Sequence, residues 1–365
     1  MKTSQIPSVL TMCAVLLFGD KTGSATSYAV VDLTPTGSTY SCATGIAGGQ
    51  QVGYGDPNFS SASHALLWSG TAASTIDLHP DGFTQSCGLA IGGGQQVGYG
   101  DPNFSSATHA LLWSGTAAST VDLHPIGFTS SFAVGVGGGQ QVGYGWTATA
   151  SHDTHALLWT GTAASAIDLN PIGFTMSTVY GVNGGQQVGF GRGSATHALL
   201  WSGTAASAVD LNPTGFTGSV AYGVSGAQQV GFGTLLGSND THALLWSGTA
   251  ASVTDLNPVG FRQSEARSIW GGQQVGSGTT IGSNDHHALL WSGTATSTVD
   301  LHQFLPTGFT SSLATGIDGF GNIVGSARDN SDNIHAILWQ PIPEPATLWL
   351  LALGGLTKFR RRQPA

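Results

Sequence analysis

The amino-acid sequence predicts an all-β protein, a seven-bladed β-propeller with four strands in each blade. Three observations carry this prediction. A unit of about 45 residues recurs seven times, each unit holds four short strand-like runs, and the first and last units are incomplete in complementary ways. Repetition at this period is typical of solenoids and propellers, and four strands in roughly 45 residues are the content of one propeller blade.

Three short motifs mark each copy of the unit. His-Ala-Leu-Leu-Trp occurs six times, with His-Ala-Ile-Leu-Trp as the seventh copy. Asp-Leu accompanies all seven copies, and Gln-Gln-Val-Gly occurs six times with Asn-Ile-Val-Gly as its last form. We expect the tryptophans of the first motif to fill the space between blades; an exposed aromatic set that binds sugars is the alternative.

Four strands are expected in one unit, at residues 72–78, about 84–91, 95–99 and 109–113. Turns rich in Gly and Asn separate these runs, and no capped helical run interrupts them. A parallel β-helix is the rival architecture, but its turns are usually shorter. Glycines inside the strands are expected to let neighbouring blades approach closely near the axis.

The hairpin between the His-Ala and Asp-Leu strands sets the expected pairing. Gly70-Thr71 suits a two-residue type II′ loop, which takes Gly first and places His64 opposite Asp77. We expect such pairs to be structural hydrogen bonds rather than metal ligands or catalytic bases, because buried polar groups need partners. The same rule gives six pairs: His64–Asp77, His109–Asp122, His155–Asp168, His197–Asp210, His242–Asp255 and His287–Asp300.

A seventh pair joins the two ends of the repeat region. Residues 28–33 contain an Asp-Leu strand with no His-Ala strand before it, and residues 335–339 form a His-Ala strand with no Asp-Leu strand after it. A ring in which the first strand completes the last blade brings Asp32 to His335 and removes two bare strand edges. An open solenoid would leave both edges exposed and would need capping repeats, which the sequence does not show.

The charge balance excludes several classes of partner and site. Between residues 28 and 340, four arginines and no lysine stand against 17 acidic residues, which leaves a net charge of −13. Such an anionic body repels nucleic acid and anionic lipid. Without lysine it also has no phosphate-binding GxxxxGK loop and no Schiff-base residue.

The same residues give no sign of an enzyme or of a cofactor. Glycosidase chemistry needs two carboxylates at a fixed separation, and Glu265 is the one Glu before the C-terminal tail. No GxSxG, HExxH or thiol–base set is present. Variation gathers in one loop of each unit, which we expect on one face of the ring, where binding would evolve. Its Asp and Asn content allows weak Ca²⁺ binding, but solvated turn chemistry is the simpler interpretation.

The N-terminus has the pattern of a secretory signal, which we place at residues 1–25. Lys2 precedes an apolar stretch at residues 9–18, and Gly23-Ser24-Ala25 offers small residues for cleavage. A buried N-terminal strand or a misassigned start codon is the alternative. Export would permit a disulfide between Cys42 and Cys87, although equivalent points on adjacent blades are expected to lie too far apart.

The C-terminal residues 341–365 contain a second sorting pattern. Pro343-Glu344-Pro345 precedes 11 mostly apolar residues, and Lys358 and the cluster Arg360, Arg361 and Arg362 follow. The apolar run is short of the roughly 20 residues that span a bilayer, which fits transient insertion held by the cations. The order resembles the PEP-CTERM sorting signal. That resemblance implies a membrane-inserted precursor, recognition by an exosortase-type enzyme, and release or attachment at a bacterial cell surface or extracellular matrix.

The repeat region itself, residues 28–340, resembles the HAF family of extracellular repeats. The resemblance rests on His-Ala-x-x-Trp, Asp-Leu-x-Pro-x-Gly and the Gly-Val or Gly-Ile stretch before Gln-x-Val-Gly. It implies an exported repeat protein and supplies no ligand or catalytic residue.

We therefore expect an exported structural or interaction scaffold that meets a surface or matrix polymer. This hypothesis predicts near-equivalent blades and no converging titratable cluster at the axis. The alternatives are a carbohydrate-binding or carbohydrate-active propeller that uses the variable loops, and Ca²⁺-dependent assembly.

Overall fold

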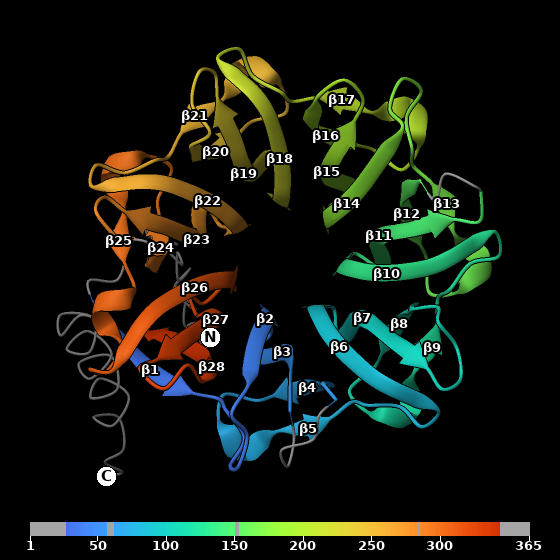
Figure 1. The fold of residues 1–365 in the computed structure, drawn as a ribbon, viewed down its shortest axis with the longest axis horizontal. Helices are drawn as coiled ribbons and strands as arrows, with labels where there is room; N and C mark the ends of the chain where they lie inside the picture. Colours follow the sequence, from blue (N-terminus) through green and yellow to red (C-terminus); the bar gives the residue numbers. More distant parts are fainter. Residues whose placement is uncertain (1–26, 57–61, 150–152, 284, 344–365) are drawn as a thin grey trace, which may run out of the picture.

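The computed structural model describes residues 27–56, 62–149, 153–283 and 285–343, and these form a closed ring of seven blades (Figure 1). Each blade is a four-stranded antiparallel sheet, and the seven sheets surround one axis. The predicted seven-bladed propeller is confirmed.

The inner strands are β2 (Ser41–Ala47), β6 (Phe83–Gly92), β10 (Phe128–Gly137), β14 (Met176–Asn183), β18 (Phe216–Ser225), β22 (Phe261–Trp270) and β26 (Phe309–Ile317). The second strands are β3 (Gln50–Gly55), β7 (Gln95–Pro102), β11 (Gln140–Thr147), β15 (Gln186–Arg192), β19 (Gln228–Leu235), β23 (Gln273–Thr280) and β27 (Ile323–Asp329). The third strands are β4 (His64–Trp68), β8 (His109–Trp113), β12 (Thr154–Trp159), β16 (Thr196–Trp201), β20 (Thr241–Trp246), β24 (His286–Trp291) and β28 (Ile334–Pro341).

The outer strands are short: β5 (Ile76–Asp77), β9 (Val121–Asp122), β13 (Ile167–Asp168), β17 (Val209–Asp210), β21 (Thr254–Asp255), β25 (Val299–Asp300) and, for the last blade, β1 (Tyr28–Asp32). Short 3₁₀ helices are η2 (Ala72–Ser74), η3 (Ala117–Ser119), η4 (Ala163–Ser165), η5 (Ala205–Ser207), η6 (Ala250–Ser252), η7 (Ala295–Ser297) and η8 (His302–Phe304). Blades are numbered 1 to 7 by their inner strands, from β2 to β26.

The expected two-residue hairpin is wrong. Residues 72–74 form the helix η2, the strand is confined to residues 76–77, and Leu66 rather than His64 lies opposite Asp77. The Ser74 hydroxyl donates to the Thr71 carbonyl at 2.6 Å and accepts from the Ser69 N–H at 2.8 Å. These local bonds offer the backbone an alternative to the strand ladder, which lengthens the turn and shifts the register by two residues.

The glycine of Gln-Gln-Val-Gly is required by a bulge in the inner strand. In blade 1 the pairing shifts between Ala43 and Gly45, opposite Gly53. A Cβ atom on Gly53 would lie 1.9 Å from the Cys42 carbonyl oxygen. Near the axis, a Cβ atom on Gly181 would lie 2.6 Å from the backbone carbonyl oxygen of Tyr222 in the next blade. The glycines therefore permit the close blade packing that the sequence predicted.

The seven motif tryptophans fill the seams between blades, as predicted. Each is completely buried. Trp68 of blade 1 packs in one cluster with Leu33, Val324 and Leu338 of blade 7. The alternative of an exposed tryptophan set for sugar binding is therefore wrong. The seven residues are Trp68, Trp113, Trp159, Trp201, Trp246, Trp291 and Trp339.

The first strand closes the ring, as the sequence predicted. β1 pairs antiparallel with β28, with Val30 opposite Trp339, and the Leu33 N–H donates to the Ala336 carbonyl at 2.8 Å. Figure 1 shows this blue strand completing the red blade. Blade 7 therefore ends in the same kind of outer strand as the other six, and neither terminus leaves a bare edge.

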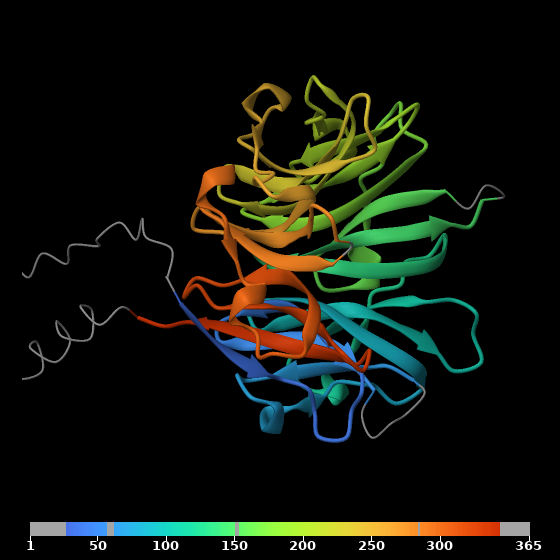
Figure 2. The same ribbon diagram turned by 60° about the vertical axis from the view of Figure 1, so that its left-hand side comes forward.

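The two faces of the ring differ in what they carry. The Ile342 N–H donates to the Ser27 carbonyl at 3.0 Å, so both ends of the described chain leave together. In Figure 2 they leave on the opposite side from the loops that join second to third strands. We call the side with the chain ends the tail face and the side with those loops the loop face.

Several sequence predictions concern residues outside the described part. The signal at residues 1–25 lies there, as do all tail residues after Pro343. Within the described residues, no helix is long and apolar enough to cross a membrane. Cys42 and Cys87 carry free thiols, so the disulfide that export would permit is not formed.

Candidate functional site

The loop face carries seven His–Asp hydrogen bonds, one in each blade. The histidine Nδ1 lies 2.6–2.7 Å from the aspartate Oδ2 in every pair. Because the register differs from the expected one, the pair is diagonal rather than directly opposite. The structure thus brings together all the residues that the sequence paired: His64–Asp77, His109–Asp122, His155–Asp168, His197–Asp210, His242–Asp255, His287–Asp300 and His335–Asp32.

Each pair continues into the next blade through a buried serine that the sequence argument missed. In blade 1, Asp77 Oδ1 accepts the N–H of His79 at 2.8 Å, and His79 Nδ1 lies 2.9 Å from Ser86 Oγ. Ser86 Oγ in turn accepts the N–H of Ala65 at 3.0 Å. We call this chain of contacts the blade joint. Its serines are Ser41, Ser86, Ser131, Ser177, Ser219, Ser264 and Ser312, all fully or almost fully buried.

The residue between aspartate and serine varies among joints. It is His79, His124 or His302 in three joints, Asn in three others and Thr34 in the last. Asn170 copies the histidine geometry, because its Oδ1 accepts from Ser177 Oγ at 2.7 Å. Burial, and then the neighbouring His64 ring stacked at 4.0 Å, lower the pKa of His79. The ring of His79 is therefore built to stay neutral.

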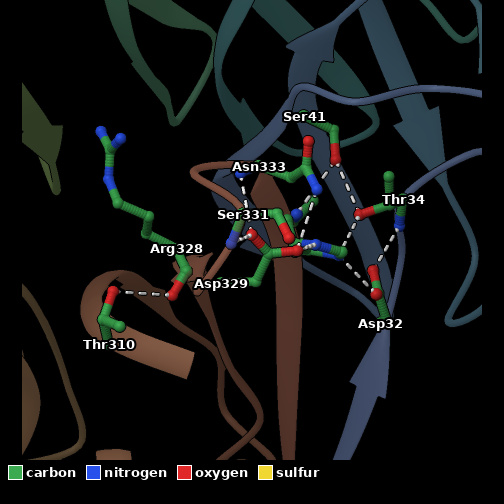
Figure 3. Close-up of polar contacts among 10 residues, drawn as sticks. Asp32, Thr34, Ser41, Thr310, Arg328, Asp329, Ser331 and Asn333 are labelled. Atoms are coloured by element: carbon green, nitrogen blue, oxygen red, sulfur yellow. Dashed lines mark hydrogen bonds and ion pairs between the residues drawn. The ribbon is translucent and has the colours of Figure 1, made fainter. Parts of the chain in front are cut away.

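The joint that closes the ring has an extra carboxylate (Figure 3). His335 Nδ1 lies 2.7 Å from Asp32 Oδ2, and its Nε2 lies 3.4 Å from Asp329 Oδ2. The Asn333 side-chain amide, with backbone N–H groups of Asn333 and Ser331, lowers the pKa of Asp329 to about 2. Asp32 of the first strand thus joins the two ends of the repeat region, and the ionised Asp329 lies against the other nitrogen of the same histidine ring.

A cavity of about 200 Å³ lies on the axis, lined by three residues from each of the seven inner strands; we call it the axial channel. Most of the lining is aliphatic. Three larger polar side chains, Tyr180, Tyr222 and Arg267, come from blades 4, 5 and 6. The same position holds Thr44, Leu89, Val134 and Thr315 in the other blades.

Half-buried aromatic side chains line the inner seams of blades 1 to 5. Tyr180 and Tyr222 have ring centroids 5.1 Å apart, and Phe132 and Tyr144 stack at 4.9 Å. Serine replaces the second-strand aromatic residue in blades 6 and 7. We call the set the aromatic belt: Tyr54, Tyr99, Phe132, Tyr144, Tyr180, Phe190, Tyr222 and Phe232.

An ion pair lies in blade 6, next to the last residues of the aromatic belt in blade 5. Glu265 Oε1 accepts from Arg267 Nε at 2.9 Å and from Nη2 at 2.5 Å. The Arg267 guanidinium lies 5.5 Å from the centre of the Tyr222 ring. Burial lowers the pKa of Arg267, but Glu265, Tyr222 and Tyr180 together raise it by more, so the net change is a rise. Burial, followed by that carboxylate, raises the pKa of Tyr222 to about 12.

This cluster corrects one expectation. The scaffold hypothesis predicted no converging titratable group at the axis, yet Glu265, Arg267, Tyr222 and Tyr180 converge there. The signal was present in the sequence. At one position before the repeated Gly, six copies carry Thr, Leu, Val or Tyr, and the seventh carries Arg267.

The variable loops and their neighbours expose apolar side chains more than the Asp and Asn content predicted. Asp329 Oδ1 accepts the N–H of Ser331 at 2.7 Å, and the Ser283 hydroxyl donates to Asp285 at 2.6 Å, which is turn chemistry. Large apolar side chains stand open to solvent beside them: Phe104, Ile126, Trp146, Ile172, Leu236, Val259 and Ile281. Among the described residues, no group of three or more His, Cys, Asp or Glu could hold a metal.

Comparison with known proteins supports the fold and the tail. No curated protein matches the chain. The fold is similar to that of oligogalacturonate lyase from Vibrio parahaemolyticus, with a TM-score of 0.59, 11% identity, and 88% of this chain and 95% of that chain covered. It is also similar to the β-propeller domain of the Trilobed protease from Pyrococcus furiosus, with a TM-score of 0.56, 10% identity, and coverage of 82% and 95%. At these identities the likeness shows the fold alone.

The tail gives the functional signal. Residues 341–363 match the PEP-CTERM protein-sorting motif. This motif marks the chain as an exported, cell-surface protein whose described part is a seven-bladed propeller.

Proposed function

We propose that the protein is an interaction scaffold at the cell surface, sorted by an exosortase-type enzyme and displayed with its loop face away from the membrane. The PEP-CTERM match supports sorting and export, and the resemblance of the repeats to the HAF family agrees with it. We propose a role in binding rather than catalysis; Glu265, the one Glu before the C-terminal tail, forms an ion pair with Arg267.

The position of the chain ends carries this proposal. Ser27 and Ile342 are hydrogen-bonded to each other on the tail face, opposite the loop face (Figure 2). The last ring pairing is Tyr28 with Pro341, at the first residue of the sorting motif. Processing of the tail beyond this point leaves every blade intact, and a membrane-held tail leaves the loop face free.

The loop face has the chemistry of an interaction surface. Phe104, Ile126, Ile172 and Val259 are completely exposed there, on four different loops, and offer apolar contacts to a partner. The anionic body disfavours nucleic acid and anionic lipid as partners. The supported partner is an uncharged or weakly charged surface or matrix polymer.

Surface labelling tests the orientation. Two variants of the full chain that each add one cysteine, Ser106→Cys on the loop face and Ser69→Cys on the tail face, both replace exposed side chains. In cells that carry the sorting enzyme, a membrane-impermeant thiol reagent should label Ser106→Cys faster, above the background of the parent chain. Equal labelling, or faster labelling at position 69, would contradict the orientation.

The sorting step has its own test. Replacing Arg360, Arg361 and Arg362 with Ala removes the cations that hold the tail, so the chain should no longer be processed and should fail to reach the surface. Normal processing and surface display of this variant would contradict the sorting proposal.

A further inference from the structure

We propose that the axial channel binds one neutral sugar ring, stacked on Tyr180 and Tyr222 of the aromatic belt and held by Arg267 with its partner Glu265. This adds a ligand class to the proposed interaction role. The inference rests on the channel alone, so its test does not depend on how the chain is sorted.

Two residues of the aromatic belt supply the stacking surface. Tyr180 and Tyr222 both line the axial channel, and their ring centroids lie 5.1 Å apart at an interplanar angle of 57°. Both side chains are half-buried. A pyranose has an apolar face of C–H groups, which packs favourably against rings that bury much area with little flexibility.

The polar side of the channel supplies both donors and acceptors. Arg267 engages Glu265 through Nε and Nη2 at one carboxylate oxygen, Oε1. Arg267 Nη1 and Glu265 Oε2 have no hydrogen bond to any described residue, nor do the hydroxyls of Tyr180 and Tyr222. Burial raises the pKa of Tyr180 and Tyr222, so both phenols remain donors at neutral pH. A sugar hydroxyl both donates and accepts, which suits this mixture.

The charges favour a neutral ring over an acidic one. Glu265 already neutralises Arg267, and its free oxygen would repel a sugar carboxylate. The net charge of −13 between residues 28 and 340 adds to that repulsion. The cavity of about 200 Å³ is smaller than the roughly 300–1,000 Å³ of sites for drug-sized ligands, so it takes one ring.

Titration of the full chain with defined sugars tests the proposal. The panel is methyl glucoside, galactoside, mannoside and xyloside, with glucuronic and galacturonic acids as charged counterparts. We expect at least one neutral glycoside to bind more tightly than either acid, measured by calorimetry. Absence of binding by all the neutral glycosides, or preference for an acid, would overturn the proposal.

Conservative variants locate the site. Tyr180→Phe and Tyr222→Phe each remove one hydroxyl and should weaken binding about 3- to 10-fold. Arg267→Lys keeps the charge but loses the planar fork and should weaken it about 10-fold. The controls are Tyr28→Phe, whose side chain is buried on the outer strand of blade 7, and Arg262→Lys, exposed on the same strand as Arg267; both should bind as the parent does.

Thermal melting of each variant separates binding from folding. The two Tyr→Phe variants should melt as the parent does, because neither hydroxyl bonds to a described residue. Unchanged affinity in both Tyr→Phe variants and in Arg267→Lys would place any sugar site elsewhere and overturn the channel assignment.

Discussion

The blade joints are nearly identical in all seven blades, whereas the wall of the axial channel differs from blade to blade. Every joint repeats the same His–Asp contact at 2.6–2.7 Å and the same buried serine. Along the channel, equivalent positions hold Thr44, Leu89, Tyr180 and Arg267. The copies therefore agree where blades meet and differ where a ligand would lie.

This contrast has a physical basis. A joint must satisfy buried polar groups in each of seven seams, so each copy faces the same requirement. The channel is a single space shared by seven strands, and one ligand needs different groups on its different sides. A residue that departs from the repeat, such as Arg267 or Glu265, is thus a better guide to binding than one that recurs.

We expect the largest loss in the free energy of unfolding from changes in the seams between blades. Trp113→Ala empties a completely buried position between blades 1 and 2 and should cost about 3–5 kcal/mol in the free energy of unfolding. Chemical denaturation measures it. The matched control is Trp270→Ala, where the side chain is 48% exposed, which should change stability by less than about 0.5 kcal/mol. Equal costs would contradict the role of the seams.

A cross-link tests the closing seam. Ala29 and Gln340 are exposed and lie directly opposite each other in β1 and β28. The double variant Ala29→Cys/Gln340→Cys should oxidise spontaneously and raise stability by roughly 2–4 kcal/mol, because the bridge constrains the unfolded chain.

The controls for this cross-link are Ala29→Cys and Gln340→Cys made separately. Burial raises the pKa of the native Cys42 thiol and raises that of Cys87 to about 11, which disfavours both as reactive thiolates. Failure of the pair to cross-link in the folded protein would contradict ring closure.

Blade joints that contain His79, His124 or His302 should lose stability in acid, whereas joints with Asn in that place should not. Burial, and then the stacked neighbouring histidine, lower the pKa of His79, His124 and His302 below the ordinary value of 6.5. As the pH falls through 6.5, these histidines take up protons in the unfolded chain before they do so in the folded protein. The free energy of unfolding therefore falls until the lowered pKa of the folded state is reached, and is constant below it. Above pH 6.5 these groups do not reduce the free energy of unfolding.

The triple variant His79→Asn/His124→Asn/His302→Asn should therefore lose less melting temperature between pH 7.5 and 5.5 than the parent. Asn170 already makes the same contact to its serine, so the variant keeps the joint. The seven Asp-paired histidines are present in both proteins and cancel. An equal pH dependence in the two proteins would show that these three rings do not titrate with folding.

The sequence allowed the ring, its blade number and the His–Asp pairs to be predicted, because each recurs at a fixed interval. Closure was predictable because residues 28–33 and 335–339 supply two halves of one hairpin. The hairpin register was not, since Ser74 and Thr71 form local bonds that compete with the strand. The buried serines were missed because a serine in a polar-looking stretch gives no sign of its burial.

The cluster of Tyr180, Tyr222 and Arg267 in the channel could not be predicted from the sequence, for a different reason. Tyr180, Tyr222 and Arg267 are about 45 residues apart in the chain and carry no motif in common. They become neighbours because the ring places the same position of consecutive blades around one axis. Only with the blade register known do such substitutions stand out as departures from the repeat.

One paired measurement tests most directly whether the blade joints serve stability and the axial channel serves binding. Sugar affinity and melting temperature are measured for two small changes, Tyr222→Phe in the channel and Ser86→Ala in a joint. Ser86→Ala removes the acceptor for the buried Ala65 N–H and should lower stability by about 1–3 kcal/mol with affinity unchanged. Tyr222→Phe should lower affinity for the neutral glycoside with melting unchanged. A joint variant that weakens binding as much as the channel variant, or a channel variant that alters only melting, would contradict the account.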